Sequence, residues 1–392
     1  MFQLEKPYSQ NSQNLQIIGD AHGDSLAFQK SMATIGDIKS KVCKYSLGLS
    51  LEREPELAPK TQVVSLGDLI DRGGDSLGVI SQVLELRENA SAKDSSISSF
   101  EYICGNHEAL LLRFLFLDDP VDSFEMSESL LISYIKNGGL STLASLSQMD
   151  FAPKEDGFVD LAKRMALIVT KSERDALIDQ IMQDYAGYIS NLRIFLRFND
   201  KIKQFFSGMN LAVQNQDVLC VHAGFLPQFL EKYIKTPQPS RAEDNETWLD
   251  FINRRFKVAV SMALEGKLSK FNLYNQASRI RGGSGVAGPL WADISEVHNL
   301  TLPQRQKLVE YYQAIGVHTV VVGHCLVDEV TAVNLSTDDY ALEFVYIDTG
   351  ISHAYGGGSD QQSLIRDVNG RFYHIDEFGG VDLLGGCEID EL

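Results

Sequence analysis

The stretch GDLIDRGGD, residues 67–75, places three aspartates and one arginine directly after the apolar run 63–66. Burying so many carboxylates at the end of a strand costs free energy unless a positive charge lies against them. The stretch therefore predicts a charged centre where a strand ends. It also raises the question of what neutralises Asp68 and Asp71, and what Arg72 does between them.

Five further apolar runs share this design, because each leads directly into a polar or glycine-containing segment. They occupy residues 15–18, 100–104, 218–221, 319–322 and 344–347. Short continuous apolar runs predict strands that are buried on both faces. Since α/β folds collect functional side chains where such strands end, we expect the polar segments of all six runs at one edge.

Two longer stretches, residues 109–210 and 228–280, have helical character. Apolar residues at helical intervals, such as Leu177 and Ile181, support this prediction. We interpret both stretches as insertions near the site edge of one catalytic domain. That domain is expected to cover residues 15–385, with an N-terminal tail over 1–14 and an acidic C-terminal tail over 386–392.

Two local signals refine the first helical stretch. Ser172 and Asp175 have the spacing of a capping box, so a helix is expected to begin there. Asn137-Gly138-Gly139 follows an apolar helical run, and it predicts a helix end at that point.

The composition limits the partners. The chain has 392 residues, a hydrophobic content of 44% and a formal net charge of −18. A phosphate backbone would be repelled, so nucleic acid is not expected as a partner. No apolar run approaches the roughly 20 residues of a membrane span, and the N-terminus lacks the apolar segment of a signal peptide. The five cysteines form no CxxC pair, which favours a reducing, cytoplasmic compartment.

The polar strand ends supply a consistent set of metal donors. They are GDAHGD (19–24), GDLIDRG (67–73), GNHE (105–108), VHAG (221–224) and GH (323–324). Carboxylate, amide and imidazole donors without thiolate suit manganese, iron or zinc. The donors are too many for one tetrahedral ion, but two ions about 3.5–4 Å apart that share a carboxylate would use them all. A metal pair, with Asp68 between the ions, would therefore neutralise the carboxylates of this segment.

The motifs GDxHG, GDxxDRG, GNHE, HAG and GH, in this order, resemble those of the calcineurin-like metallophosphoesterases. The DRG and the glutamate of GNHE make the phosphoprotein phosphatase branch the closest. The resemblance spans residues 19–324, and the two insertions match nothing in it. It implies an α/β (α+β-like) fold, namely a metallophosphoesterase β-sandwich flanked by helices.

The resemblance also implies a metal centre and a reaction. Two divalent ions are expected, manganese first, with iron or zinc as the alternatives. A hydroxide bridging the ions would attack phosphorus directly. The expected metal ligands are Asp20 and His22 for the first ion, Asp68 for both ions, and Asn106, His222 and His324 for the second ion.

The remaining roles concern the phosphate and the leaving group. The resemblance makes His107 the general acid, Asp71 its carboxylate partner and Arg72 a ligand of the phosphate oxygens. Asn106 is expected at the phosphate as well. For a second phosphate-binding arginine the sequence offers Arg281, with Arg279 as competitor, and for a residue of a loop over the site it offers Tyr355, together with His353.

A thiol-based mechanism is excluded by spacing. His324-Cys325 is similar to the HC pair of cysteine-dependent tyrosine phosphatases, which need an arginine six residues past the cysteine. Thr331 occupies that place here.

The function predicted from these residues is metal-dependent hydrolysis of phosphomonoesters on a phosphorylated protein or peptide. Phosphotyrosine is slightly favoured over phosphoserine and phosphothreonine, because bacterial-type members of this branch include tyrosine-directed enzymes. Some of them are effectors delivered into host cells by intracellular bacteria, and such delivery is an open possibility here. The alternatives are a dinucleoside polyphosphate hydrolase and a non-catalytic docking scaffold. The target protein and the oligomeric state stay open.

Overall fold

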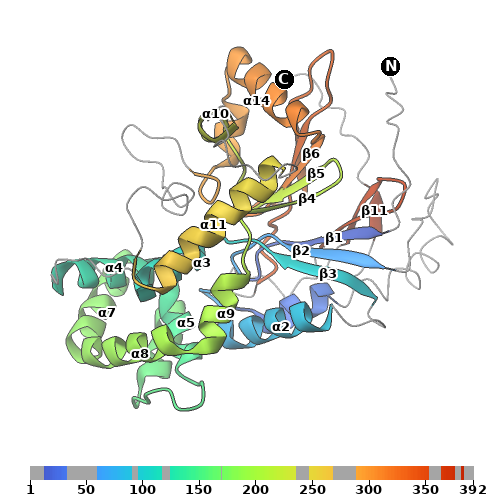
Figure 1. The fold of residues 1–392 in the computed structure, drawn as a ribbon. Helices are drawn as coiled ribbons and strands as arrows, with labels where there is room; N and C mark the ends of the chain where they lie inside the picture. Colours follow the sequence, from blue (N-terminus) through green and yellow to red (C-terminus); the bar gives the residue numbers. More distant parts are fainter. Residues whose placement is uncertain are drawn as a thin grey trace.

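Two β-sheets packed face to face form the centre of the molecule (Figure 1). The structure is a computed structural model, and it describes residues 13–32, 60–90, 96–116, 124–168, 170–234, 247–267, 288–352, 363–375 and 381–383.

The first sheet has six strands in the order β11-β10-β9-β1-β2-β3. Its parallel part consists of β1, β2 and β3, and its antiparallel part of β9, β10 and β11. The bounds are Asn14–Ile18 for β1, Thr61–Ser65 for β2, Ile97–Tyr102 for β3, Ser363–Arg366 for β9, Phe372–Ile375 for β10 and Val381–Leu383 for β11.

The second sheet has five strands in the order β4-β5-β6-β8-β7. Here β5, β6 and β8 are parallel, whereas β4 and β7 pair antiparallel at the two edges. The bounds are Ala212–Asn215 for β4, Val218–Val221 for β5, Thr319–Val322 for β6, Thr331–Asn334 for β7 and Glu343–Tyr346 for β8.

The six apolar runs of the sequence correspond to the six parallel strands. The runs 218–221 and 319–322 coincide with β5 and β6. The run 100–104 starts later than β3 and also ends later, because Ile103 has left the strand and pairs with Asn210 in an isolated bridge. Within each sheet the parallel strands end at the same edge, and this places their polar segments together.

Alternate residues of these strands face different cores. Val64 packs in the cluster between the sheets, with Ile17 of the first sheet and Cys220 of the second. Val63 and Leu219 face the other way and belong to the core beneath the helices. A continuous apolar run is therefore required, since both faces of the strand are covered. The arrangement confirms the predicted β-sandwich flanked by helices.

Helices cover the outer faces of the sandwich. Below the first sheet lies α2 (Ser76–Asn89), which contacts β3 and the helix α9 (Asp200–Gly208). Above the second sheet α10 (Pro227–Ile234) packs on α14 (Leu302–Ala314), near the short helix α13 (Ile294–His298). The long helix α11 (Trp248–Leu264) runs along β4 and α9.

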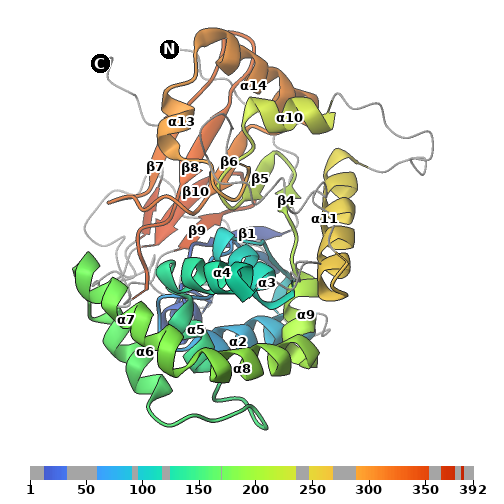
Figure 2. The same ribbon diagram turned by 90° about the vertical axis from the view of Figure 1, so that its left-hand side faces the viewer.

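A block of six helices stands at the end of the sandwich where the parallel strands finish (Figure 2). They are α3 (Asn106–Phe116), α4 (Phe124–Lys136), α5 (Gly139–Leu146), α6 (Phe158–Ala166), α7 (Lys171–Asp184) and α8 (Ala186–Phe198). The predicted start of α7 is wrong: Thr170 caps it by accepting from the backbone N–H of Glu173, so Ser172 lies within the helix.

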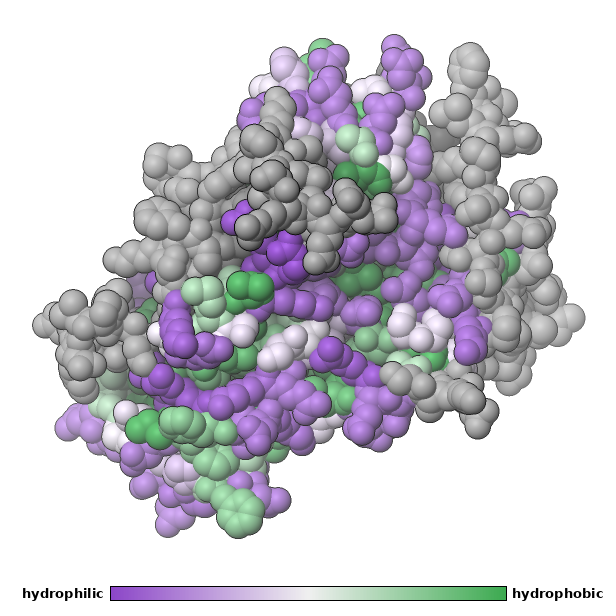
Figure 3. Space-filling model, viewed as in Figure 1, coloured by the Kyte–Doolittle hydropathy of each residue, from purple (hydrophilic) through white to green (hydrophobic). Residues whose placement is uncertain are grey.

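The surface of the described residues is mostly polar on the face seen in Figure 3, with apolar side chains gathered toward its lower end. The helical block carries exposed apolar residues, among them Phe151, Leu167 and Phe198. Among the described residues, no helix has the length and apolar character needed to span a membrane.

Candidate metal centre

The ends of five parallel strands bring the motif residues together. His22 follows β1, Asp68 follows β2, and His107 lies in the first turn of α3 after β3. His222 and His324 follow β5 and β6 of the second sheet. The site thus lies where the two sheets meet, and its side chains are drawn from both.

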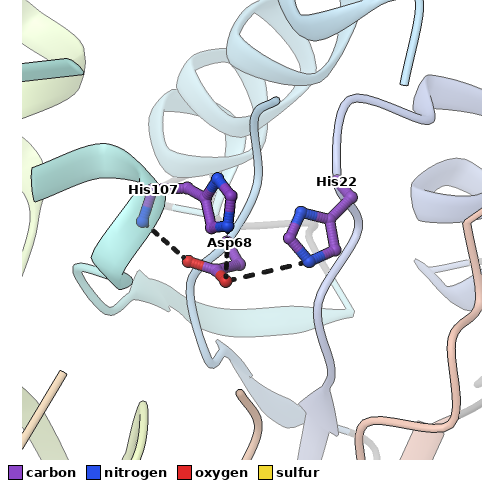
Figure 4. A group of neighbouring side chains, drawn as sticks. All are labelled: His22, Asp68 and His107. Atoms are coloured by element: carbon purple, nitrogen blue, oxygen red, sulfur yellow. Dashed lines mark hydrogen bonds and ion pairs between the residues drawn. The ribbon is translucent and has the colours of Figure 1, made fainter. Parts of the chain in front are cut away.

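Asp68 has one carboxylate oxygen that faces two imidazoles. Its Oδ2 lies 3.7 Å from Nε2 of His22 and 3.8 Å from Nε2 of His107. Figure 4 shows both rings pointing at this carboxylate, and it also shows the backbone N–H of His107, which donates to Oδ1 at 3.0 Å. His22, Asp68 and His107 are all buried, and their donor atoms lie close enough together to hold a metal ion, to which His107 would contribute only while its Nε2 is unprotonated.

The other carboxylate oxygen belongs to a second group. Oδ1 of Asp68 lies 3.4 Å from Nε2 of His222, and His324 completes this group. Asp68 is therefore common to both groups, as a residue shared by two ions should be. Since the donors are carboxylate and imidazole, the two groups have the ligand chemistry of divalent metal sites.

Asn106 lies at the centre of the second group. One terminal amide atom of Asn106 is 2.9 Å from Nε2 of His222 and 3.2 Å from Nδ1 of His324. The same atom is 3.0 and 2.9 Å from the two oxygens of Asp68. Without a cation an NH₂ group would satisfy these acceptors, whereas a cation among them would draw in the amide oxygen. The position suits a metal ligand.

Backbone carbonyls orient two of the histidines. Nδ1 of His222 lies 2.9 Å from the carbonyl oxygen of Leu66, and Nδ1 of His22 lies 3.3 Å from that of Ile70. A carbonyl can only accept, so Nδ1 carries the proton in both rings. Nε2 of each ring is then an acceptor that faces the site, which is the usual arrangement of metal-binding histidines.

Burial sets the charges of these groups. It lowers the pKa of His22, with the charge of His107 adding to the effect. Burial also lowers the pKa of His222, and that of His324 to about 3. Burial alone would raise the pKa of Asp68, but the surrounding imidazoles, led by His222, hold it below its ordinary value. Neutral imidazoles around an ionised carboxylate are the protonation states that a metal requires.

Asp20 belongs to neither group of donor atoms in the part of the chain that the structure describes. Its Oδ2 accepts from the backbone N–H of His324 at 2.9 Å, and its Oδ1 is buried without a hydrogen-bond partner among the described residues. Burial and the neighbouring Asp348 raise the pKa of Asp20 well above its ordinary value. A buried carboxylate whose second oxygen has no hydrogen-bond donor among the described residues is suited to bind a cation.

Asp348 is a carboxylate that sequence reasoning missed. It follows β8, as the other site residues follow their strands, and that position was its only signal. Its Oδ2 is buried without a hydrogen-bond partner in the described ranges, and Oδ1 accepts from the N–H of Gly350 at 3.2 Å. Burial raises the pKa of Asp348 to about 6. Asp20 and Asp348 thus place two buried carboxyl groups side by side on this side of the site.

Glu108, also missed, holds the loop that carries Asp68. Its Oε2 accepts from the N–H groups of Asp68 at 2.9 Å and Gly105 at 2.8 Å, and its Oε1 from those of Leu69 at 2.8 Å and Ile70 at 3.3 Å. Burial and Asp68 raise the pKa of Glu108 to about 8, against the N–H donors, which favour the charged form. The glutamate of GNHE therefore builds the site without facing a ligand.

His107 points its two nitrogens in different directions. Nδ1 lies 2.8 Å from Oδ2 of Asp71, and Nε2 is buried without a hydrogen-bond partner among the described residues. Burial opposes protonation, but Asp68 and the hydrogen bond to Asp71 raise the pKa of His107 above its ordinary value. The ring is thus arranged to carry a proton on Nε2, toward the site.

Arg72 touches His22 in this structure. Its Nη1 lies 3.0 Å from Nε2 of His22, the nitrogen expected to bind the first metal. The backbone N–H of Arg72 donates to the carbonyl of Gly138 at 3.1 Å. Because one lone pair cannot serve both partners, a metal on His22 requires the guanidinium to move, and the freed guanidinium could then bind an anion.

The backbone of the site is strained. Of the seven non-glycine residues with positive φ in the described ranges, five are predicted site residues. They are His22, Asp68, Asp71, Arg72 and His324, with φ of 42°, 46°, 70°, 66° and 64°. Strained residues of this kind cluster at functional sites. Gly105 is required for another reason, since a Cβ there would lie 2.2 Å from Oδ1 of Asp68.

Four predicted positions lie outside the described residues: Arg279, Arg281, His353 and Tyr355. Cys325 is buried, and burial raises its pKa to about 11. A catalytic thiol needs a lowered pKa, so this finding agrees with the exclusion of a thiol mechanism.

The fold is shared with solved protein-tyrosine phosphatases. The cold-active protein-tyrosine phosphatase of the psychrophile Shewanella sp. matches with a TM-score of 0.52 at 16% identity, over 95% of this chain and 80% of that chain. Another structure of a cold-active protein tyrosine phosphatase matches with a TM-score of 0.51 at 16% identity, over 95% and 78%. At this identity the likeness establishes the fold alone.

Another solved structure is less similar. A metallophosphoesterase from Sphaerobacter thermophilus covers 93% of this chain and 87% of its own, but at 10% identity its TM-score of 0.33 is too low to support an argument. No protein-family model matches the sequence, and no curated protein matches it.

Proposed function

We propose that the chain is a metal-dependent phosphoprotein phosphatase of the calcineurin-like metallophosphoesterases. The observation that carries the proposal is Asp68, whose two oxygens face two separate groups of imidazoles. A divalent ion pair held there, with Asp20 and Asn106 as further ligands, would activate water for attack on phosphorus. Manganese is the first candidate for both ions, with iron or zinc as alternatives.

The chain's own residues account for the rest of the reaction. Arg72, once displaced from His22, would bind phosphoryl oxygens and stabilise the charge that builds up on them. His107 would donate a proton from Nε2 to the leaving oxygen, while Asp71 holds Nδ1. The ordered motifs and the shared fold of a protein-tyrosine phosphatase support a phosphorylated protein or peptide as substrate, with phosphotyrosine favoured.

A metal-supplemented assay tests this proposal. The protein would be stripped with chelator, reloaded with manganese, iron or zinc, and given phosphotyrosine peptide, phosphothreonine peptide and diadenosine tetraphosphate. We expect phosphate release from the peptides, fastest from phosphotyrosine. Faster cleavage of the dinucleotide would replace the proposal by a polyphosphate hydrolase, and bound metal without any turnover would favour the docking scaffold. Asp68→Asn serves as the control and should lose both metal and activity.

A further inference from the structure

Asp71 is fully buried, and its carboxylate is held from both sides. Oδ2 accepts from Nδ1 of His107 at 2.8 Å. Oδ1 accepts from the hydroxyl of Tyr134 at 2.7 Å and from that of Thr142 at 2.6 Å. Charge-assisted hydrogen bonds of this length are strong and directional. The carboxylate therefore has no freedom to turn its plane away from His107.

The hydroxyl of Thr142 is fixed by its own partners. It accepts from the backbone N–H of Asp71 at 2.8 Å while it donates to the carboxylate of the same residue. The hydroxyl of Ser76 lies 2.9 Å away. Asp71 has a φ of 70°, which a non-glycine residue adopts only when its surroundings enforce it. Thr142 supplies such enforcement, since it holds both the backbone and the side chain.

The ring of Tyr134 is also fixed. It stacks on Phe114 of α3 with centroids 5.4 Å apart and an interplanar angle of 16°, and Tyr134 is 1% exposed. Burial and the nearby Asp71 raise the pKa of the Tyr134 hydroxyl well above its ordinary value, so it is a neutral donor. A neutral donor can hold a carboxylate without adding charge to the site.

Both hydroxyls belong to the inserted helices and to neither sheet. Tyr134 lies on α4 and Thr142 on α5, and the turn between these helices carries Gly138, whose carbonyl accepts from the N–H of Arg72. Gly138 has a φ of 97°, and a Cβ there would lie 2.7 Å from Cγ of Arg72. The hairpin formed by α4 and α5 thus holds Asp71 and Arg72, two consecutive residues of the GDLIDRG loop, by hydrogen bonds.

We propose that Tyr134 and Thr142 are positioning residues that fix the carboxylate of Asp71, so that His107 presents Nε2 to the leaving group. The inference rests on the proposed function, in which His107 is the acid. It gives the first helical insertion a part in the chemistry itself, in addition to any part in substrate recognition.

Four variants separate positioning from folding. Tyr134→Phe and Thr142→Val each remove one hydroxyl at nearly constant volume, and Thr142→Ser restores it. Tyr102→Phe is the matched control, because its buried hydroxyl donates to the carbonyl of Phe205 at 2.6 Å. Melting temperatures compare each variant with this control. If Tyr134→Phe does not fold, the Thr142 pair decides the question.

The first readout is steady-state kinetics on two small substrates. An aryl phosphate with a good leaving group needs little acid assistance, whereas an alkyl phosphate needs it fully. We expect Tyr134→Phe and Thr142→Val to lower kcat for the alkyl phosphate by about tenfold or more, with a much smaller loss on the aryl phosphate and KM nearly unchanged. Thr142→Ser should recover most of kcat. Equal losses on both substrates, or none, would overturn the proposal.

The second readout does not depend on turnover. In the metal-free protein the Nδ1 proton of His107, assigned with the variant His107→Asn, should give a downfield NMR signal in the wild type and in Tyr102→Phe. The signal should shift upfield or vanish by exchange in Tyr134→Phe and Thr142→Val. An unchanged signal in both variants would overturn the positioning role. If the protein hydrolyses no phosphoester, only the proposed function fails, and this readout still decides whether the hydroxyls position the ring.

Discussion

Asp68 shows how one side chain organises the centre. It stands in a loop that Glu108 fixes through three of the loop's backbone N–H groups, and its oxygens lie 3.4–3.8 Å from three imidazoles. The loss of this carboxylate would remove the one group that both sets of donor atoms share. Two neighbouring residues permit sharper tests, because each is expected to act on the substrate and not on the metals.

His107→Asn should keep its metals and lose turnover. The substitution removes the donor that Nε2 presents to the site, and we expect kcat for an alkyl phosphate to fall roughly 10²–10⁴-fold. An aryl phosphate with a good leaving group should lose much less. Metal analysis of the purified variant, next to the two kcat values, checks the prediction. Wild-type turnover of the alkyl phosphate would rule out His107 as the acid.

Arg72→Ala should weaken the binding of anions that mimic the product. Because a hydrogen bond to a charged group contributes about 1.5–3 kcal/mol, the inhibition constants for inorganic phosphate and vanadate should rise by roughly tenfold to a hundredfold. Arg113→Ala on the exposed side of α3 is the control and should leave both constants unchanged. Equal constants in both variants would count against a phosphate-binding Arg72.

Some residues of the site can be predicted from the sequence, and others cannot. His22, Asp68, Asn106, His107 and His222 all stand in motifs, and the fold brings them together. Glu108, Tyr134, Thr142 and Asp348 were given no role, because each acts through contacts with segments far away in the chain. Spacing along the sequence does not encode such contacts.

Helices and strands were predicted best where one local pattern determines them. The six parallel strands are short runs covered on both faces, and this condition leaves an unbroken apolar signature. The antiparallel strands β4, β7, β9, β10 and β11 are only three or four residues long, and none was predicted. β4, β7 and β11 also lie at sheet edges, where one side of the strand is open and the apolar pattern is weaker, whereas β9 lies inside its sheet.

The start of α3 is tied to the site by Glu108, so this residue should govern the stability of the loop after β2. In Glu108→Gln an NH₂ group would face two of the four N–H donors. We expect the free energy of unfolding of the metal-free protein to fall by about 3 kcal/mol in urea titrations above pH 8, where Glu108 is ionised. Glu173→Gln, at the exposed start of α7, should change it by less than about 0.5 kcal/mol. A Glu108→Gln variant as stable as the wild type at this pH would contradict the role of Glu108 in holding the loop.

The two sheets are joined through the site as well as through their core. Asp20, His22 and Asp68 follow strands of the first sheet, while His222 and His324 follow strands of the second. Ions bound by both sets would link segments that are about three hundred residues apart. The motifs could not show which sheet each strand joins, because pairing between distant strands leaves no local trace.

Metal binding should therefore stabilise the whole fold. With free manganese at a hundred times the dissociation constant, the expected gain is about 2.7 kcal/mol. Calorimetry of chelated and reloaded protein should show a higher Tm with metal. His298→Gln, on the exposed end of α13, should keep this increase, and Asp68→Asn should lose it. The same Tm with and without metal would contradict the predicted link.

The buried carboxylates should make the metal-free protein sensitive to pH. Because the pKa of Asp348 is raised to about 6 in the folded chain, the folded state retains a proton between about pH 4 and 6 that the unfolded state has already released. The free energy of unfolding should thus fall by about 3 kcal/mol as the pH rises through this window, relative to Asp348→Asn. Urea titrations of both proteins in chelator measure the difference, and parallel curves would refute it.

The positive φ angles of the site also bear on how such a protein could be altered by selection. Left-handed backbone costs an ordinary residue about 1–2 kcal/mol, which glycine avoids. A library screened for heat resistance alone would therefore be enriched in glycine at Arg72, whose φ is 66°, and would discard the proposed anion-binding arginine. At Asp71 the three hydrogen bonds of the buried carboxylate outweigh this strain. Selection for stability must therefore keep Arg72 fixed and seek its gains in the helices.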